Sequence, residues 1–167
     1  EGGFAGEIYA VNPKRENVQG LKSYPSVSAI DRPVDLAVIA IPAPQIPGVM
    51  HECGNLGVGA AIVLSAGFSE VGNAGAALQS EIVDIARTYG IVLIGPNCLG
   101  IMSPVSGLNA TFAAGMATRG RVAFVGQSGA LITAILDWSL SEGVGFSSIV
   151  SLGSMADVGW GDLIDYL

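Results

Sequence analysis

Four short apolar runs, each followed by a break of small residues, constrain the fold of this chain more than any other feature. The runs cover residues 36–41, 61–64, 91–94 and 122–125, and Val, Ile, Leu and Ala dominate them. Runs of this length are typical of strands that are buried on both faces of a parallel sheet. Ligands bind such sheets beyond the carboxyl ends of the strands. We therefore expect a ligand at the segments that follow these runs.

The composition excludes several classes of protein. Half of the 167 residues are apolar and 13% are charged, which is sufficient for a sizeable core. The net charge of −7 argues against nucleic acid as a partner, and no apolar run is long enough to span a bilayer. Cys53 and Cys98 have neither metal-ligand nor Cys-x-x-Cys spacing, so we expect no metal site and a cytoplasmic location.

Helical patterns alternate with the apolar runs. Residues 45–55 and 75–89 are expected to form helices, because apolar residues recur on one face, and Gly90 stands where a left-handed cap would end the second helix. Residues 16–32 are expected to form a loop with a short helix near residues 27–30. The order of strands and helices predicts an α/β fold with a doubly wound parallel sheet.

A change of rhythm over residues 102–120 predicts a domain boundary, because Gly, Pro and Ser interrupt the apolar pattern there. We expect a first domain over residues 1–115 and the start of a second domain over residues 120–167. Its helix, over residues 130–140, is apolar nearly all round and is therefore predicted to be buried. The chain begins with Glu1 and stops in a helix-like stretch, so we expect a piece of a longer polypeptide.

The segment Gly126-Gln127-Ser128-Gly129-Ala130 joins an expected strand to this helix. Ser128 suits the N-cap, and the glycines leave backbone N–H groups open to an anion. An ordinary helix cap is the simpler alternative. A nucleophile elbow is disfavoured, because residue 130 is Ala and the only histidine, His51, precedes the serine.

Other segments after expected strands also suit a ligand. Lys14 and Arg15, two of seven basic residues, can pair with phosphates, although solvated basic turns are common. The proline-rich residues 41–44 present an apolar edge that suits an adenine or a pantetheine arm, or they form a rigid link. Residues 65–70 and 95–98 have the same two interpretations. No Gly-x-Gly-x-x-Gly follows a strand, so hydride transfer is poorly supported.

Taken in order, five of these segments resemble the NDP-forming acyl-CoA synthetase family, which includes ADP-forming acetate–CoA ligases and the α subunit of succinyl-CoA synthetase. The resemblance spans nearly the whole chain. It implies a Rossmann-like CoA-binding domain over residues 1–115, without the family's first strand and Gly-rich loop, and the start of a flavodoxin-like ligase domain over residues 120–167. The motifs are Asn12-Pro13-Lys14, Ile41-Pro42-Ala43-Pro44, Ser65-Ala66-Gly67-Phe68-Ser69-Glu70, Gly95-Pro96-Asn97-Cys98-Leu99-Gly100 and Gly126-Gln127-Ser128-Gly129-Ala130-Leu131.

The resemblance also implies a reaction and a set of binding residues. The family interconverts acyl-CoA, phosphate and NDP with acid, CoA and NTP through a phosphohistidine. His51 does not match that histidine, so no catalytic residue is expected in this chain, and the chain alone should not turn over. The implied CoA-binding residues are Asn12, Pro13, Lys14, Arg15, Ile41, Pro42, Ala43, Pro44, Leu64, Ser65, Ala66 and Gly67, with Asn97 and Cys98 near the thiol end, while Gln127, Ser128, Gly129 and Ala130 would dock phosphate and the phosphohistidine.

The ligands implied by the resemblance are CoA or acyl-CoA, phosphate and a small carboxylic acid. A Mg-nucleotide would bind to an ATP-grasp-type domain or subunit outside this chain. The alternative is a catalytically silent acyl-CoA sensor fused to a protein lysine acetyltransferase domain of the GNAT type, and a downstream Gly-His-Ala-type histidine would favour the ligase. A generic Rossmann nucleotide binder, the third interpretation, predicts that NAD binds at least as tightly as CoA.

Overall fold

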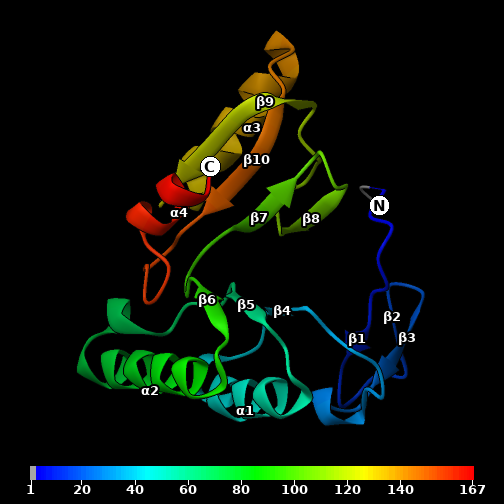
Figure 1. The fold of residues 1–167 in the computed structure, drawn as a ribbon, viewed down its shortest axis with the longest axis vertical. Helices are drawn as coiled ribbons and strands as arrows, with labels where there is room; N and C mark the ends of the chain where they lie inside the picture. The colour runs from blue at the N-terminus through cyan, green and yellow to red at the C-terminus, as the bar shows by residue number, and fades with distance from the viewer. Residues whose placement is uncertain (1–2) are drawn as a thin grey trace.

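A computed structural model gives the structure of residues 3–167. Residues 1 and 2, which the first predicted domain includes, lie outside the described residues. The chain forms two bodies (Figure 1): a first body of residues 3–98 and a second body of residues 99–167. No helix in this described range is long and apolar enough to cross a membrane.

The main sheet of the first body consists of three parallel strands in the order β4-β5-β6, namely β4 (Leu36–Ile39), β5 (Ala60–Val63) and β6 (Val92–Ile94). Helices α1 (Ile46–Leu56) and α2 (Asn73–Tyr89) connect them and lie on one face of the sheet (Figure 1). Each helix ends at a left-handed glycine, with φ 82° at Gly57 and 71° at Gly90. The predicted strand–helix alternation is confirmed here.

A second small sheet of the first body lies within the region that was predicted to be a loop. Its order is β1-β3-β2, with β1 (Ala10–Val11) parallel to β3 (Leu21–Tyr24) and β2 (Asn17–Val18) antiparallel to it. The loop prediction for residues 16–32 is therefore wrong in part. Gln19 and Gly20, at φ 52° and 83°, form the two-residue turn that favours a hairpin. The short helix is confirmed as the 3-10 turn η1 (Val27–Ala29).

The second body contains a four-stranded sheet in the order β8-β7-β10-β9. Strands β9 (Arg119–Gly126) and β10 (Phe146–Ser151) are parallel, helix α3 (Gly129–Glu142) joins them, and the helix α4 (Trp160–Tyr166) follows. Strands β7 (Gly100–Ser103) and β8 (Leu108–Thr111) form a hairpin that pairs with β10 through β7. The region of broken rhythm thus contains regular structure, and the domain boundary at residues 115–120 stays a prediction.

Apolar side chains join the two bodies. The first core lies between the main sheet and helices α1 and α2, around Met50, Phe68 and Ile82. The second core packs α3 against β9, β10 and the hairpin. On the other face of β5, Ile62 packs with Cys98 and with Ala110 of the hairpin. The hairpin therefore pairs with one sheet and covers part of the other.

Two burial predictions are wrong in part. Of the four predicted runs, the one in the central strand β5 is buried, whereas Val38 on β4, Val92 on β6 and Val122 on β9 are 46%, 51% and 50% exposed. The hairpin is too narrow to cover the whole outer face of the main sheet. Helix α3 buries Ile132 and Leu136 but leaves Trp138 55% exposed, because the sheet contacts only one of its faces.

Candidate functional site

The loops after β4, β5 and β6 lie side by side, as parallel strands require. The Ser65 hydroxyl after β5 donates a hydrogen bond of 2.6 Å to the Ile41 carbonyl after β4. The Asn97 N–H after β6 donates one of 3.0 Å to the Ser65 carbonyl. Gly67 approaches Ala43 so closely that an added Cβ would lie 3.0 Å from its Cβ. Three of the five predicted segments are thus brought together.

This group of loops offers an apolar surface to a ligand. Pro42 and Pro44 are exposed and have no N–H group, and Ala66 beside them is exposed too. Ala43 is buried under them, and Ile41 and Leu64 are half-buried. A flat apolar part of a ligand can therefore cover these loops, because the prolines have no backbone N–H group that would lose its hydrogen bond to water.

The turn after β6 separates the two residues that were predicted to lie near a thiol end. Asn97 is exposed and has a left-handed φ of 54°. Cys98 is buried, and its thiol donates to the Val63 carbonyl at 3.3 Å. Burial raises the pKa of the Cys98 thiol to about 11, so it stays protonated at neutral pH. The side chain of Cys98 thus faces the core, and only its backbone is left for a predicted ligand contact.

Glu70 stabilises the turn after β5. Its carboxylate accepts hydrogen bonds from the N–H groups of Gly67 at 2.5 Å and Phe68 at 3.1 Å. Partial burial disfavours the charged form, but the N–H donors of Gly67, Glu70 and Phe68 outweigh it and lower the pKa of the Glu70 carboxyl. Glu70 therefore acts as a structural anion of the loop.

Replacement of Glu70 by Gln is expected to lower the melting temperature more at pH 7 than at pH 3. A carboxyl whose folded pKa is lowered stabilises the fold above its unfolded pKa, and this contribution is lost as the pH falls through the folded pKa. The effect should stay below about 1 kcal/mol, because the carboxylate is largely exposed to water. Thermal unfolding at both pH values measures it, with Glu81→Gln on the solvent face of α2 as control. An equal difference at pH 7 and pH 3 would contradict this role.

The segment before α3 forms the predicted N-cap. The Ser128 hydroxyl accepts a hydrogen bond of 3.3 Å from the N–H of Leu131. The N–H groups of Gly129 and Ala130 lie in the first turn, where a helix has no acceptor of its own for them. Gln127, Ser128 and Ala130 are exposed. The start of α3 therefore presents free donors and the positive end of the helix dipole.

The start of α3 lies next to the residues through which the chain leaves the turn after β6 and enters the second body. A Cβ added to Gly129 would lie 3.5 Å from the Cβ of Leu99, the second residue after Asn97. A fourth predicted segment thus joins the group. An anion at the start of α3 and a ligand along the loops of the first body would meet near Asn97.

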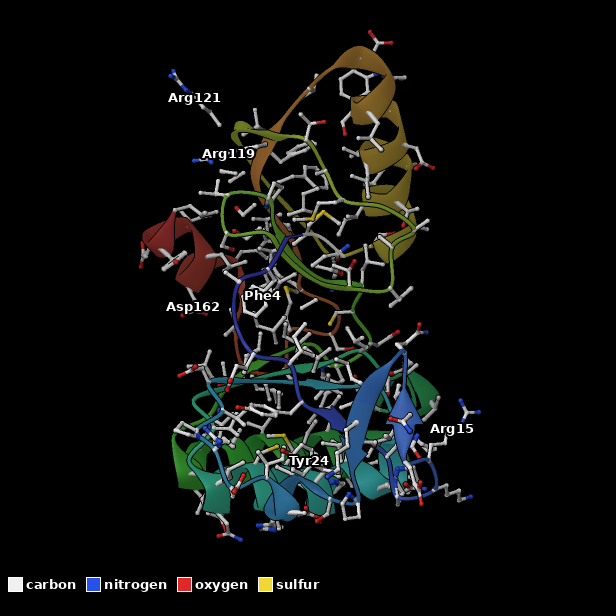
Figure 2. The ribbon with its side chains drawn as sticks, turned by 90° about the vertical axis from the view of Figure 1, so that its right-hand side faces the viewer. Phe4, Arg15, Tyr24, Arg119, Arg121 and Asp162 are labelled. Carbon is white, nitrogen blue, oxygen red and sulfur yellow. The ribbon has the colours of Figure 1, made fainter. Side chains whose placement is uncertain are left out.

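The basic turn, by contrast, lies on the separate small sheet. The Asn12 side chain accepts hydrogen bonds from the N–H groups of Lys14 at 2.9 Å and Arg15 at 3.1 Å, which fixes the turn after β1. Both basic side chains are exposed, and Arg15 points into solvent (Figure 2). A hollow of about 310 Å³ lies at this turn. Within residues 3–167 no hydrogen bond links the turn to the other loops.

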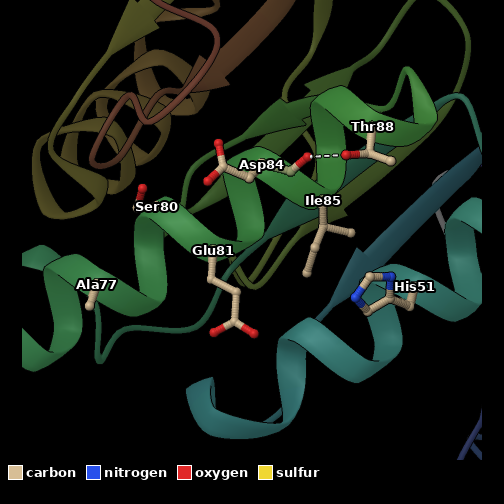
Figure 3. A pocket seen from close by; sticks show the side chains of 7 residues that line it. All are labelled: His51, Ala77, Ser80, Glu81, Asp84, Ile85 and Thr88. Carbon is tan, nitrogen blue, oxygen red and sulfur yellow. Dashed lines mark hydrogen bonds between the residues drawn. The ribbon is translucent and has the colours of Figure 1, made fainter.

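A larger hollow lies elsewhere, on the outer side of α1 and α2 (Figure 3). It measures about 540 Å³, and the carboxylates of Glu81 and Asp84 line it together with His51. Two carboxylates would repel the phosphates of a nucleotide or of CoA. The Nδ1 atom of His51 lies 3.4 Å from the hydroxyl of Tyr89, the last residue of α2. Among the described residues, no three His, Cys, Asp or Glu side chains group as metal ligands.

One segment of the site escaped the sequence analysis. The residues after β10, beginning with Gly153 and Ser154, contact the turn after β6, since the Ser154 N–H donates to the Pro96 carbonyl at 2.9 Å. The sequence pattern that predicted the other loops is present here too, because small residues follow an apolar run at this strand as well.

Comparisons with known proteins agree with this arrangement. Residues 4–104 match the family model of the CoA binding domain. Residues 119–167 match that of the succinyl-CoA ligase like flavodoxin domain. The first match alone covers more than half of the chain.

Curated relatives and solved structures extend the similarity. The chain is 48% identical to ADP-forming acetate–CoA ligase I of Archaeoglobus fulgidus over 98% of its own length and 24% of the relative. It is 45% identical to the α subunit of ADP-forming acetate–CoA ligase II of Pyrococcus furiosus, over 97% of the chain and 35% of that subunit.

A solved structure, the dinucleotide-forming acetyl-coenzyme A synthetase 1 of Ca. Korarchaeum cryptofilum in complex with phosphate and ADP, superposes with a TM-score of 0.94 at 42% identity, over 99% of this chain and 35% of that one. The chain thus spans between about a quarter and about a third of the length of these relatives. These matches and the α/β architecture agree that the chain belongs to the NDP-forming acyl-CoA synthetase family, with a CoA-binding domain followed by the start of a succinyl-CoA ligase-like flavodoxin domain.

Proposed function

We propose that this chain is the CoA-binding part of a longer NDP-forming acyl-CoA synthetase of the acetate–CoA ligase type. The complete enzyme interconverts acyl-CoA, phosphate and NDP with acid, CoA and NTP. One observation carries the proposal: the loops after β4, β5 and β6 meet the start of α3, so a CoA site and an anion site adjoin. The relatives named above, all ADP-forming or dinucleotide-forming synthetases, support it.

CoA lies along the loops at the carboxyl ends of the strands. Its pantetheine arm covers the exposed Pro42, Pro44 and Ala66, and its thiol end reaches Asn97. The phosphates of CoA pair with Lys14 and Arg15 at the basic turn, where two adjacent cations offset the net negative charge of the chain. The buried Cys98 contributes backbone only, because its thiol is hydrogen-bonded to Val63.

Phosphate and the phosphohistidine dock at residues 127–130. The free N–H groups of Gly129 and Ala130 and the dipole of α3 stabilise their negative charge. A neighbouring anion site and thiol end hold the reacting groups close together, which lowers the barrier of a reaction between two bound molecules. The histidine itself belongs to a part of the enzyme outside this chain, so this chain supplies no catalytic residue.

The remaining components lie outside this chain. A Mg-nucleotide binds to an ATP-grasp-type domain or to a partner subunit, and the name of the P. furiosus relative as a subunit α supports a partner. The third ligand is a small carboxylic acid. In this proposal the boundary between the two family domains falls between residues 115 and 120, after the hairpin β7–β8, although that hairpin pairs with the sheet of the second body. The relatives described above give no support to a fusion with an acetyltransferase.

Replacement of both Lys14 and Arg15 by Ala is expected to weaken CoA binding by the complete enzyme about tenfold or more. Each substitution removes a charge-assisted hydrogen bond to a phosphate of CoA. Added salt should reduce the difference, since both side chains are exposed. Calorimetric titration with CoA measures the affinity, and Arg87→Ala in the last turn of α2 is the matched control.

The same titrations test the proposed function as a whole. The wild-type enzyme should bind CoA and acetyl-CoA, and it should bind NAD more weakly than CoA. Absence of heat with CoA, or NAD binding at least as tight, would overturn the proposal. Unchanged CoA affinity of the double variant would instead overturn only the role of the basic turn.

A further inference from the structure

The segment after β10 runs alongside the main sheet of the other body. We call residues 152–158 the bridging segment; in Figure 1 it is the chain between β10 and α4, which extends toward β6. Its Ser154 N–H donates to the Pro96 carbonyl at 2.9 Å, its Ala156 N–H to Gly95 at 3.1 Å and its Val158 N–H to Leu93 at 3.3 Å. The numbers of the partners fall as those of the donors rise, so the bridging segment is antiparallel to β6. It covers the edge of β6 that no other strand pairs with.

A side chain completes this row of hydrogen bonds. The carboxylate of Asp157 accepts a bond of 3.0 Å from the N–H of Leu93, a residue with no exposed surface. A charged acceptor binds an N–H more strongly than a neutral carbonyl does. Leu93 therefore holds the bridging segment through both of its backbone groups, one paired with Val158 and the other with Asp157.

The other end of the bridging segment is tied to the start of α3. The N–H of Leu152, which is fully buried, donates to the carbonyl of Gly126 at 2.9 Å, directly before residues 127–130. The preceding Ser151, also fully buried, accepts a bond of 2.9 Å from the N–H of Leu99. Gly153 adopts a φ of 56°, and a Cβ there would lie 2.3 Å from the Pro96 carbonyl oxygen. The bridging segment thus packs closely against the turn after β6, and glycine is required at residue 153.

We propose that the bridging segment fixes the distance between the thiol end of the CoA site and the anion site at α3, and that Asp157 is the positioning residue. The inference rests on the proposed function. One end of the segment contacts the turn that carries Asn97, and the other contacts the residue before the α3 loop. Two reacting groups on different bodies gain from proximity only while their separation is held, and a displacement of about 1 Å costs on the order of a hundredfold in rate.

The test uses Asp157→Ala and Asp157→Asn in the complete enzyme. The alanine variant should lose about tenfold or more in kcat, while its affinity for CoA and its KM for phosphate stay within about twofold of wild type, because neither site loses a contact. The asparagine variant should recover most of kcat, since its amide oxygen still accepts the N–H of Leu93. Asp162→Ala is the matched control, because Asp162 accepts a backbone N–H from Gly159 at α4 and lies outside the bridging segment.

The outcomes separate this inference from the proposed function. An alanine variant with the kcat of wild type would overturn the positioning role and leave the proposed function intact. Loss of CoA affinity in parallel with kcat, without recovery in Asp157→Asn, would show a general structural role and overturn it too. A wild-type enzyme that binds CoA but forms no acyl-CoA would overturn both.

Discussion

A Gly95→Ala variant is expected to lose about 3 kcal/mol of the free energy of unfolding, because two costs add at this position. Gly95 has a φ of 96°, a conformation that side chains rarely adopt. An added Cβ would also lie 2.5 Å from the carbonyl oxygen of Val63 and 3.1 Å from the Cys98 sulfur. The first contact is with backbone at the end of the buried central strand, so it cannot move away cheaply.

Gly90→Ala is the matched control for this experiment. Gly90 also has a positive φ, 71°, but no atom lies within 4 Å of an added Cβ. Its loss should therefore be limited to the conformational cost of about 1 kcal/mol. Urea denaturation followed by circular dichroism measures both variants. Equal losses would show that the close approach of Gly95 to Val63 contributes nothing, and the tight connection of the turns after β5 and β6 would then be wrong.

Gly129→Val is expected to reduce phosphate-dependent turnover of the complete enzyme about a hundredfold. A branched side chain would cover the N–H groups at the start of α3 and would press against Leu99, the residue nearest to an added Cβ. Removal of one preorganised donor to a charged intermediate typically costs between about a hundredfold and a thousandfold in rate. The KM for phosphate should rise with the loss of kcat, because the variant obstructs the anion site itself.

Gly129→Ala is the control that distinguishes obstruction of the anion site from a general effect of replacing the glycine. A single methyl group fits, since its distance of 3.5 Å from the Leu99 Cβ is an ordinary contact, and φ at this position is helical. The alanine variant should therefore retain most of its turnover. Steady-state kinetics with phosphate as the varied substrate measures both variants. Turnover of Gly129→Val at the level of wild type would remove the start of α3 from the proposed mechanism.

Local sequence patterns were sufficient for the elements that bury an apolar face. Helix α2 and strand β5 follow such patterns, and Gly90 ends its helix in the predicted left-handed conformation. The hairpins β2–β3 and β7–β8 were missed, because their strands mix polar and apolar residues and derive their stability from pairing rather than from a continuous apolar run. Exposure of Trp138 on α3 was missed for a related reason: an apolar residue is buried only where another element covers it.

In the candidate site, too, some features could be predicted from the sequence and others depend on the tertiary structure. The loops at residues 41–44, 65–67 and 95–98 could be predicted, because each consists of small residues that directly follow an apolar run. The inward turn of Cys98 and the separate position of the basic turn depend on contacts with residues far away in the chain. So does the role of Asp157, whose partner Leu93 precedes it by 64 residues.

The amino-acid sequence by itself determined the alternation of strands and helices in the main sheet, the Ser128 cap and the family, since these depend on neighbouring residues and on motif order. Only the tertiary structure decided how the two bodies meet. The bridging segment and the hairpin join them through hydrogen bonds and packing between distant residues. A hydrogen bond between distant residues forms only when the fold brings its donor and acceptor together, and the periodicity of apolar residues along the chain does not predict which distant residues come together.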